Sequence, residues 1–162
     1  MKVPKDQVVG EVNKGWDVAK YLLGHEREMI SGMGLGGERT ALGKAVGPIE
    51  DPLLRAEIAA FDVDALAFAA MSERFIDQLK AGEAHPAMPS MMKYAGTELN
   101  KRRHELIMAA GGSDALEWDS ERSKGGKAAR DWLRTKANSI EGGTSEIQLG
   151  IVAKHILRLP GA

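Results

Sequence analysis

The chain of 162 residues contains no cysteine, only 5% aromatic residues and no long apolar run. The absence of cysteine excludes disulfides, thiolate catalysis and cysteine-bound metals, and it is compatible with the cytoplasmic location that we expect. No apolar segment approaches the roughly 20 residues that a membrane-spanning helix needs. The first residues are polar and include an early proline, so no signal segment is predicted there.

Charges of opposite sign nearly cancel, with 22 Lys and Arg against 23 Asp and Glu and a net charge of -1. This balance gives no electrostatic reason to expect nucleic acid or an anionic membrane surface as a partner. The histidines lie far apart and show no metal-ligand spacing, so we expect no metal site. Because 43% of the residues are hydrophobic, the chain can bury the core of one globular domain.

Apolar residues recur at helical spacing in four long segments. The expected helices cover about residues 13–33, 52–80, 90–110 and 127–138, and a short fifth helix begins near Thr144. Asp51-Pro52 predicts a helix start, and Gly111-Gly112 predicts a helix end. The segments 34–50 and 113–126 are expected to be irregular. The pattern predicts an all-α fold, an antiparallel up-down four-helix bundle with a short extra C-terminal helix.

Glu26 lies on the apolar side of the first expected helix, between Leu22 and Ile30 on a helical wheel. A carboxylate that faces a core is costly unless it is paired. Desolvation also disfavours the ionised form of a carboxyl group, which suits a general base that works near neutral pH. The alternative is a structural ion pair with an arginine of the third helix, such as Arg102 or Arg103, and both interpretations remain open.

The segment from Ile140 to Gln148 contains Glu141, a glycine pair and Thr144. Paired glycines let the backbone approach a ligand closely, and the first N–H groups of the next helix can bind an anion or a polar group. Ser145 and Gln148 have the spacing of a capping box. Taken alone, this glycine pair and the one at 111–112 are equally compatible with a simple turn and a helix end.

Several segments together resemble the acyl-CoA dehydrogenase family, in order and over nearly the whole chain. Val9 to Trp16 resembles the link from the middle β-domain of that family to its C-terminal helices, and His25-Glu26-Arg27 resembles its first C-terminal helix. Arg130-Asp131, Ile140 to Gln148 and Ile151 to Lys154 resemble its C-terminal signature. The resemblance implies that residues 1–12 are an extended segment leading from a β-domain absent here, and that residues 13–162 form the C-terminal helical bundle.

The resemblance also implies a flavoenzyme. In this family FAD lies between domains and against the bundle of a neighbouring subunit. A glutamate removes the α-proton of an acyl-CoA thioester while a hydride passes from the β-carbon to the flavin, and an electron-transfer flavoprotein then takes the electrons. We therefore expect a homo- or hetero-oligomer, dimeric or tetrameric, and an isolated domain that binds FAD poorly and is inactive. The alternative is a non-catalytic oligomerisation module or a decayed subunit of a hetero-oligomeric dehydrogenase.

Residue roles follow from the same resemblance. Many family members carry the catalytic glutamate directly before Gly-Thr, where this chain has Gly142, and others carry it on the first bundle helix before an arginine. We therefore expect Glu26 to be the base, with Arg27 supporting it and Glu141 as the alternative. The residues implied for FAD are Gly111, Gly112, Thr144, Glu146 and, in a degraded form of the flavin-binding arginine motif, Arg39.

Overall fold

The computed structural model describes residues 2–32 and 41–161, and these ranges contain helices and no β-strand. In chain order the elements are η1 (Lys5–Gln7), α1 (Gly15–Gly32), α2 (Leu42–Val46), α3 (Pro52–Ala81), α4 (Met88–Gly111), η2 (Gly112–Leu116), α5 (Lys127–Asn138), α6 (Ser145–Ile151) and a π-helical turn η3 (Val152–Ile156). The predicted all-α class is confirmed. The two segments expected to be irregular each contain a short helix, α2 and η2. Within the described ranges, no helix combines the length and apolar character needed to cross a bilayer.

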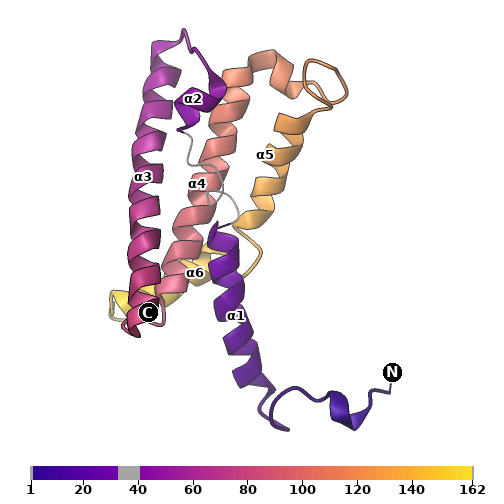
Figure 1. Ribbon diagram of the computed structural model, residues 1–162, viewed down its shortest axis with the longest axis vertical. Helices are drawn as coiled ribbons and strands as arrows, with labels where there is room; N and C mark the ends of the chain where they lie inside the picture. Colours follow the sequence, from indigo (N-terminus) through magenta and orange to yellow (C-terminus); the bar gives the residue numbers. More distant parts are fainter. Residues whose placement is uncertain (1, 33–40, 162) are drawn as a thin grey trace.

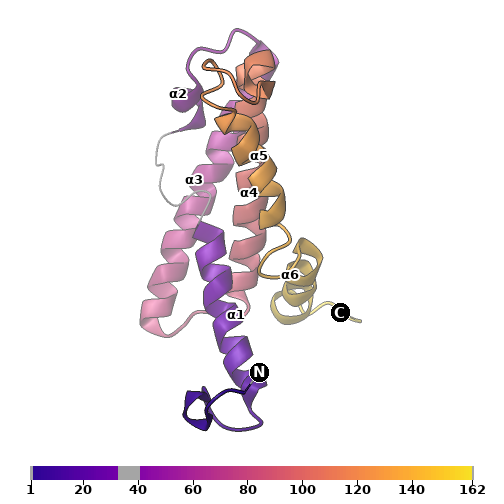
Figure 2. The same ribbon diagram turned by 90° about the vertical axis from the view of Figure 1, so that its right-hand side faces the viewer.

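Helix α4 is the centre of the domain. Figures 1 and 2 show α3 running beside it along the long axis, with α1 beside its lower half and α5 beside its upper half. Among the four long helices, the extensive contacts are those of α1, α3 and α5 with α4. Helices α1 and α5 therefore lie one after the other along α4, and neither spans its full length. Helix α6 crosses the lower end of α4.

The apolar core lies chiefly between α3 and α4. All three phenylalanines of the chain, Phe61, Phe68 and Phe75, follow α3 at intervals of seven residues and are buried. Seven residues make almost two turns of an α-helix, so these rings share one face. They pack in two clusters with Met92 and Leu106 of α4. Asp51 caps the start of α3, as predicted. Its carboxylate accepts a 2.8 Å hydrogen bond from the backbone N–H of Leu53.

The opposite face of α4 is polar and nevertheless buried. Its side chains recur every three or four residues and comprise Ser90, Lys93, Thr97, Asn100 and Arg103. This face meets α1, α5 and α6, whereas the apolar face meets α3. The second layer of helices is therefore attached to α4 through hydrogen bonds as well as through apolar contact.

Helix α1 buries a narrower stripe than its periodicity predicts. Ile30 is buried, and Leu23 and Glu26 are half-buried against the rest of the domain. Leu22, which was expected on the apolar side, is 64% exposed, and Met29, about two turns of helix further on that side, is 63% exposed. Residues 2–12 before this helix are exposed, with a short turn at η1.

Candidate functional site

The two positions that the resemblance offers for the base, Glu26 and Gly142, lie side by side. Gly142 is located in the turn between α5 and α6, and this turn packs against α1. A Cβ atom at Gly142 would lie 2.6 Å from Cδ1 of Ile30 and 3.9 Å from Oε1 of Glu26. Residues separated by more than 110 positions in the chain thus meet at one point. A Cβ atom at position 142 would therefore collide with Ile30, whereas its distance to the Glu26 carboxylate is that of an ordinary contact.

The turn has a backbone conformation that favours glycine. Gly142 and Gly143 have φ values of +66° and +97°, in a region that other residues seldom adopt. Their carbonyl oxygens accept hydrogen bonds from two fully buried side chains. Lys93 Nζ donates to the carbonyl of Gly143 at 2.8 Å, and Gln148 Nε2 donates to the carbonyls of Gly142 and Gly143 at 2.9 and 3.3 Å. Lys93 and Gln148 therefore hold the turn on the side that does not face α1.

Glu26 is half-buried at the edge of the packed stripe of α1. No hydrogen bond or ion pair joins its carboxylate to another residue within 2–32 and 41–161. Of the two arginines considered as partners, Arg102 instead pairs with Asp64 at 2.6 Å. Arg27, the next residue, has a buried Nε atom without a hydrogen-bond partner in the described ranges, and its charge acts on Lys93. The Glu26 carboxylate is therefore available to a ligand.

Glu141 has a different environment from Glu26. Its carboxylate accepts hydrogen bonds from Arg134 at 3.1 and 3.2 Å and from Asn138 at 2.6 Å. Burial opposes ionisation, but the hydrogen bonds from Arg134 and Asn138 and the positive charges of Arg134 and Lys93 outweigh it and lower the pKa of Glu141. A carboxylate held in the ionised form by such partners is a weak proton acceptor.

Thr144 and Glu146 begin helix α6. The hydroxyl of Thr144 accepts a hydrogen bond from the backbone N–H of Ile147 at 3.4 Å, so Thr144 is the N-cap of the helix and the expected cap at Ser145 is wrong. Gln148, the other residue of that expected capping box, points back to the glycine turn. Hydrogen bonds from its own backbone N–H and from the Thr144 hydroxyl lower the pKa of Glu146.

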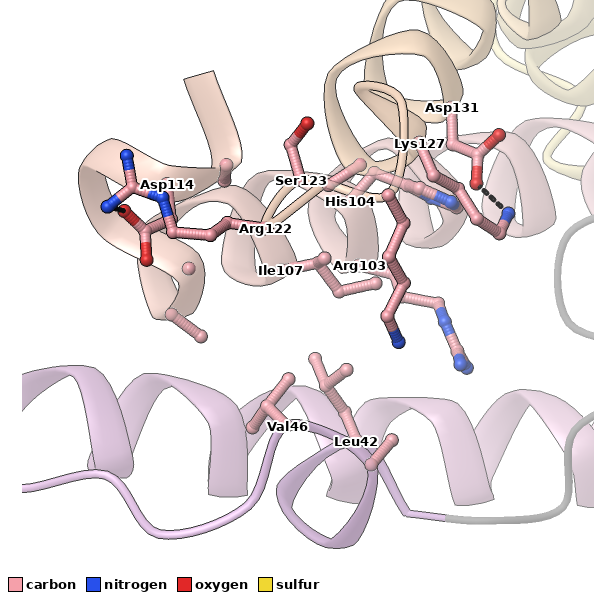
Figure 3. Close-up of a pocket in the computed structure, with 16 residues that line it drawn as sticks. Leu42, Val46, Arg103, His104, Ile107, Asp114, Arg122, Ser123, Lys127 and Asp131 are labelled. Carbon is pink, nitrogen blue, oxygen red and sulfur yellow. Dashed lines mark hydrogen bonds and ion pairs between the residues drawn. The ribbon is translucent and has the colours of Figure 1, made fainter. Parts of the chain in front are cut away.

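A second feature is an open cavity of about 680 Å³ at the other end of α4. Figure 3 shows Leu42 and Val46 of α2 on one side and Arg103 and Ile107 of α4 on the other. Gly111 also lines it, next to the positive-φ Gly112. Four basic side chains and two acidic ones contribute to the lining, namely Arg103, Arg122, Lys124, Lys127, Asp114 and Asp131. Lys127 pairs with Asp131, and Arg122 pairs with Asp114 and Glu117, so these carboxylates offset part of the positive charge. The size of the cavity and its remaining positive charge suit a nucleotide-sized anionic ligand.

The residues implied for FAD do not form one site. Gly111 and Gly112 lie at the upper cavity, whereas Thr144 and Glu146 lie at the lower end of α4 beside Lys93. The 18 residues between Lys93 and Gly111 correspond to about 27 Å of helix. Arg39 lies outside the described residues. No group of acidic and histidine side chains suited to a metal ion occurs in the part of the chain that the structure describes.

Comparison with known proteins identifies the family. The pattern described as "Acyl-CoA dehydrogenase, C-terminal domain" matches residues 13–157. The chain belongs to this family. It is 30% identical over 160 residues to acyl-CoA dehydrogenase FadE34 of Mycobacterium tuberculosis, and 29% identical over 169 residues to the short-chain specific acyl-CoA dehydrogenase of human mitochondria. These matches cover 98% and 97% of this chain, but only 22% and 39% of the relatives.

Solved structures show the same fold. The Tcur3481-Tcur3483 steroid ACAD matches with a TM-score of 0.81 at 23% sequence identity, over 99% of this chain and 44% of that chain. Its G363A variant gives the same values. At this identity the likeness concerns the fold of the acyl-CoA dehydrogenase domain. The resemblance to this family stated from the sequence is confirmed.

Several residues of this acyl-CoA dehydrogenase domain were not predicted as functional. Lys93 has no local motif, and Gln148 was assigned to a capping box, so only their burial reveals their contacts with the turn. The basic residues of the upper cavity had a signal that was available, because the stretch from Arg122 to Lys127 alternates basic residues with serine and glycine. Such a stretch is typical of a turn that presents backbone and positive charge together.

Proposed function

We propose that this domain supplies the catalytic base of an FAD-dependent acyl-CoA dehydrogenase and that Glu26 is that base. The observation that carries the proposal is the position of the Glu26 carboxylate, which is unpaired within the described ranges and lies beside the Gly142–Gly143 turn. Two exposed apolar side chains, Leu22 and Met29, are its neighbours on the surface of α1. An apolar acyl chain fits this surrounding.

In the proposed reaction, an oxygen atom of Glu26 accepts the α-proton of the acyl-CoA thioester as the C–H bond breaks. FAD, when bound, would supply the acceptor for the hydride that leaves the β-carbon, so that the product is the 2,3-enoyl-CoA. Arg27 supports Glu26 by placing a positive charge next to it in the helix. Glu141 is the less suitable base because Arg134 and Asn138 hold it in its ionised form. Electrons leave to an electron-transfer flavoprotein.

FAD would contact the domain at the cavity beside α2, because the size and charge of this cavity suit a nucleotide. Gly111 offers backbone without a side chain there, with Gly112 next to it in the chain, and Lys124 offers charge for a diphosphate. Thr144 and Glu146 lie too far along α4 to contact the same part of the cofactor. We infer that an assembled oligomer, in which neighbouring bundles share cofactors, explains the two separate sets. The isolated domain is then expected to bind FAD poorly and to be inactive.

The experiment that tests the base is Glu26→Gln in the complete enzyme. We expect the variant to retain FAD, while the anaerobic reduction of the flavin by an acyl-CoA slows by about 10²–10⁴-fold, the usual contribution of a general base. Glu105→Gln is the matched control, because Glu105 is exposed and pairs with Lys136 on the surface. Full activity in Glu26→Gln together with loss in Glu141→Gln would move the base to Glu141.

A second function is favoured by Gly142 itself, since the other position at which the family carries its base has no carboxylate here. In this alternative the domain is a non-catalytic oligomerisation module or a decayed subunit of a hetero-oligomer. The exposed apolar residues Val63 and Leu66 on α3 would then bury against a partner. Turnover that is unchanged in both Glu26→Gln and Glu141→Gln would support this alternative.

A further inference from the structure

Lys93 is a lysine with no exposed surface, in the middle of a helix face. Burial of an ammonium group is costly, and long charged side chains usually extend to water. Burial lowers the pKa of Lys93, and the negative charges of Glu141 and Glu98 oppose this change. Its ammonium makes one direct contact with the turn, the 2.8 Å hydrogen bond to the carbonyl of Gly143. Packing alone does not explain why a lysine is buried at this position.

The turn that Lys93 contacts cannot hold its position through side chains of its own. Gly142 and Gly143 have only backbone groups, and these have a conformation with positive φ values. One side of the turn faces Ile30 and Glu26 of α1. On the other side, Lys93 and Gln148 bind its two carbonyl oxygens. These two donors therefore hold the carbonyl side of the turn, while hydrogen bonds of Glu141 and Ser145 hold its two ends.

We propose that Lys93 is a positioning residue, which holds the Gly142–Gly143 turn at the distance from α1 that the Glu26 carboxylate needs. The inference rests on the proposed role of Glu26. Lys93 does not contact the substrate. Gln148 assists from α6, but it divides its amide between two carbonyls, at 2.9 and 3.3 Å. The lysine supplies the shorter bond to Gly143, and that bond is charge-assisted.

The test replaces Lys93 by methionine in the complete, FAD-loaded enzyme. Methionine has a similar length and no donor, so the turn loses its bond from α4 without a cavity. We expect kcat to fall by about 10- to 100-fold, because a displacement of about 1 Å in a reacting geometry has effects of that size. KM, flavin content and melting temperature are expected to stay close to those of the wild type.

Lys101→Met is the matched control. Lys101 lies on the same helix and pairs with Glu98 at 2.8 Å, but it does not contact the turn. We expect its kcat to be that of the wild type. Should Lys93→Met fail to fold, Lys93→Gln replaces it, since the shorter amide also cannot maintain the bond to Gly143.

Two results would overturn the positioning role of Lys93. One is an unchanged kcat in the Lys93 variant, and the other is a loss of kcat that merely follows losses of flavin and of melting temperature. Glu26→Gln, measured in parallel, tests the base separately. Full turnover in that variant would remove the proposed function and with it the role of Lys93, whereas a slowed Glu26→Gln beside an unchanged kcat in Lys93→Met would overturn the positioning role alone.

Discussion

Substitution of Gly142 by alanine adds a methyl group at the point where the turn meets α1. Two costs follow from the structure. The φ value of +66° is strained for alanine, at about 1–2 kcal/mol. The added Cβ would also lie 2.6 Å from Cδ1 of Ile30, and such overpacking of a core costs about 1–3 kcal/mol. Together the substitution is expected to reduce the free energy of unfolding by about 2–5 kcal/mol.

A second substitution separates these two costs. Ile30→Val removes the Cδ1 atom that the new methyl group would meet, and by itself it costs about 0.5–1.5 kcal/mol. In the Ile30→Val background the clash is absent, so Gly142→Ala should cost only its backbone strain. The double variant is therefore expected to be more stable than the sum of the single effects by about 1–3 kcal/mol.

Urea unfolding of the 162-residue chain, followed by circular dichroism, measures all three variants. Gly82→Ala is the control for strain alone, because Gly82 has a φ value of +70° and a Cβ atom there would meet nothing within 4 Å. If the effects of Gly142→Ala and Ile30→Val add to within about 0.5 kcal/mol, the contact between the turn and α1 is not as described.

Two further predictions concern the stability of the same chain. Gly24→Ala should stabilise it by about 0.5–1 kcal/mol in urea unfolding, because Gly24 lies inside α1 and a Cβ atom there has free space; a loss of stability would show that the surface of α1 is closely covered at this point. For Glu141, whose pKa is lowered in the folded state, the ionised carboxylate contributes stability above the ordinary value of 4.5, and this contribution disappears as the pH falls through the lowered pKa. Glu141→Gln should therefore reduce the melting temperature at neutral pH and flatten its decline in acid, whereas Glu105→Gln should leave the acid decline unchanged.

Helix ends were predictable because their signals are local. Asp51-Pro52 begins α3, and the predicted range of α5, residues 127–138, agrees with the structure. The five-residue helix α2 was missed because it is too short to show a periodicity. The cap of α6 was predicted one residue late. Both Thr144 and Ser145 can cap a helix, and the backbone conformation of the preceding glycines, which the sequence does not reveal, decides between them.

The polar face of α4 shows the limit of periodicity as a guide. Ser90, Lys93, Thr97 and Asn100 recur as the residues of a solvent-exposed face would recur. They are buried because α1, α5 and α6 form a second layer of helices over them, and no local sequence pattern indicates such a layer. The hydrogen bond from Asn100 to Asn138, at 2.8 Å, joins residues 38 positions apart. Tertiary pairing of this kind is beyond what a single sequence indicates.

The same reasoning explains which part of the candidate site could be predicted. The direction of Glu26 followed from its place on the helix, but the exposure of Leu22 and Met29 did not, because periodicity gives the centre of a buried stripe and not its width. The proximity of Glu26 to Gly142 also could not be predicted from periodicity. It depends on how α1 and the turn are both placed on α4.

This proximity gives a physical reason for the pairing of Glu26 with Gly142. In the proposed reaction a carboxylate needs space next to the reacting carbon, and we expect one of the two backbones that meet here to supply it. A side chain on the turn would collide with Ile30, as its Cβ atom alone would come within 2.6 Å. A side chain on α1 starts from a helix of 18 residues that is packed against α4. With the acid on α1, the turn must be small and must be held by other residues, which accounts for the two glycines, for Gln148 and for a lysine in a place where a lysine is costly.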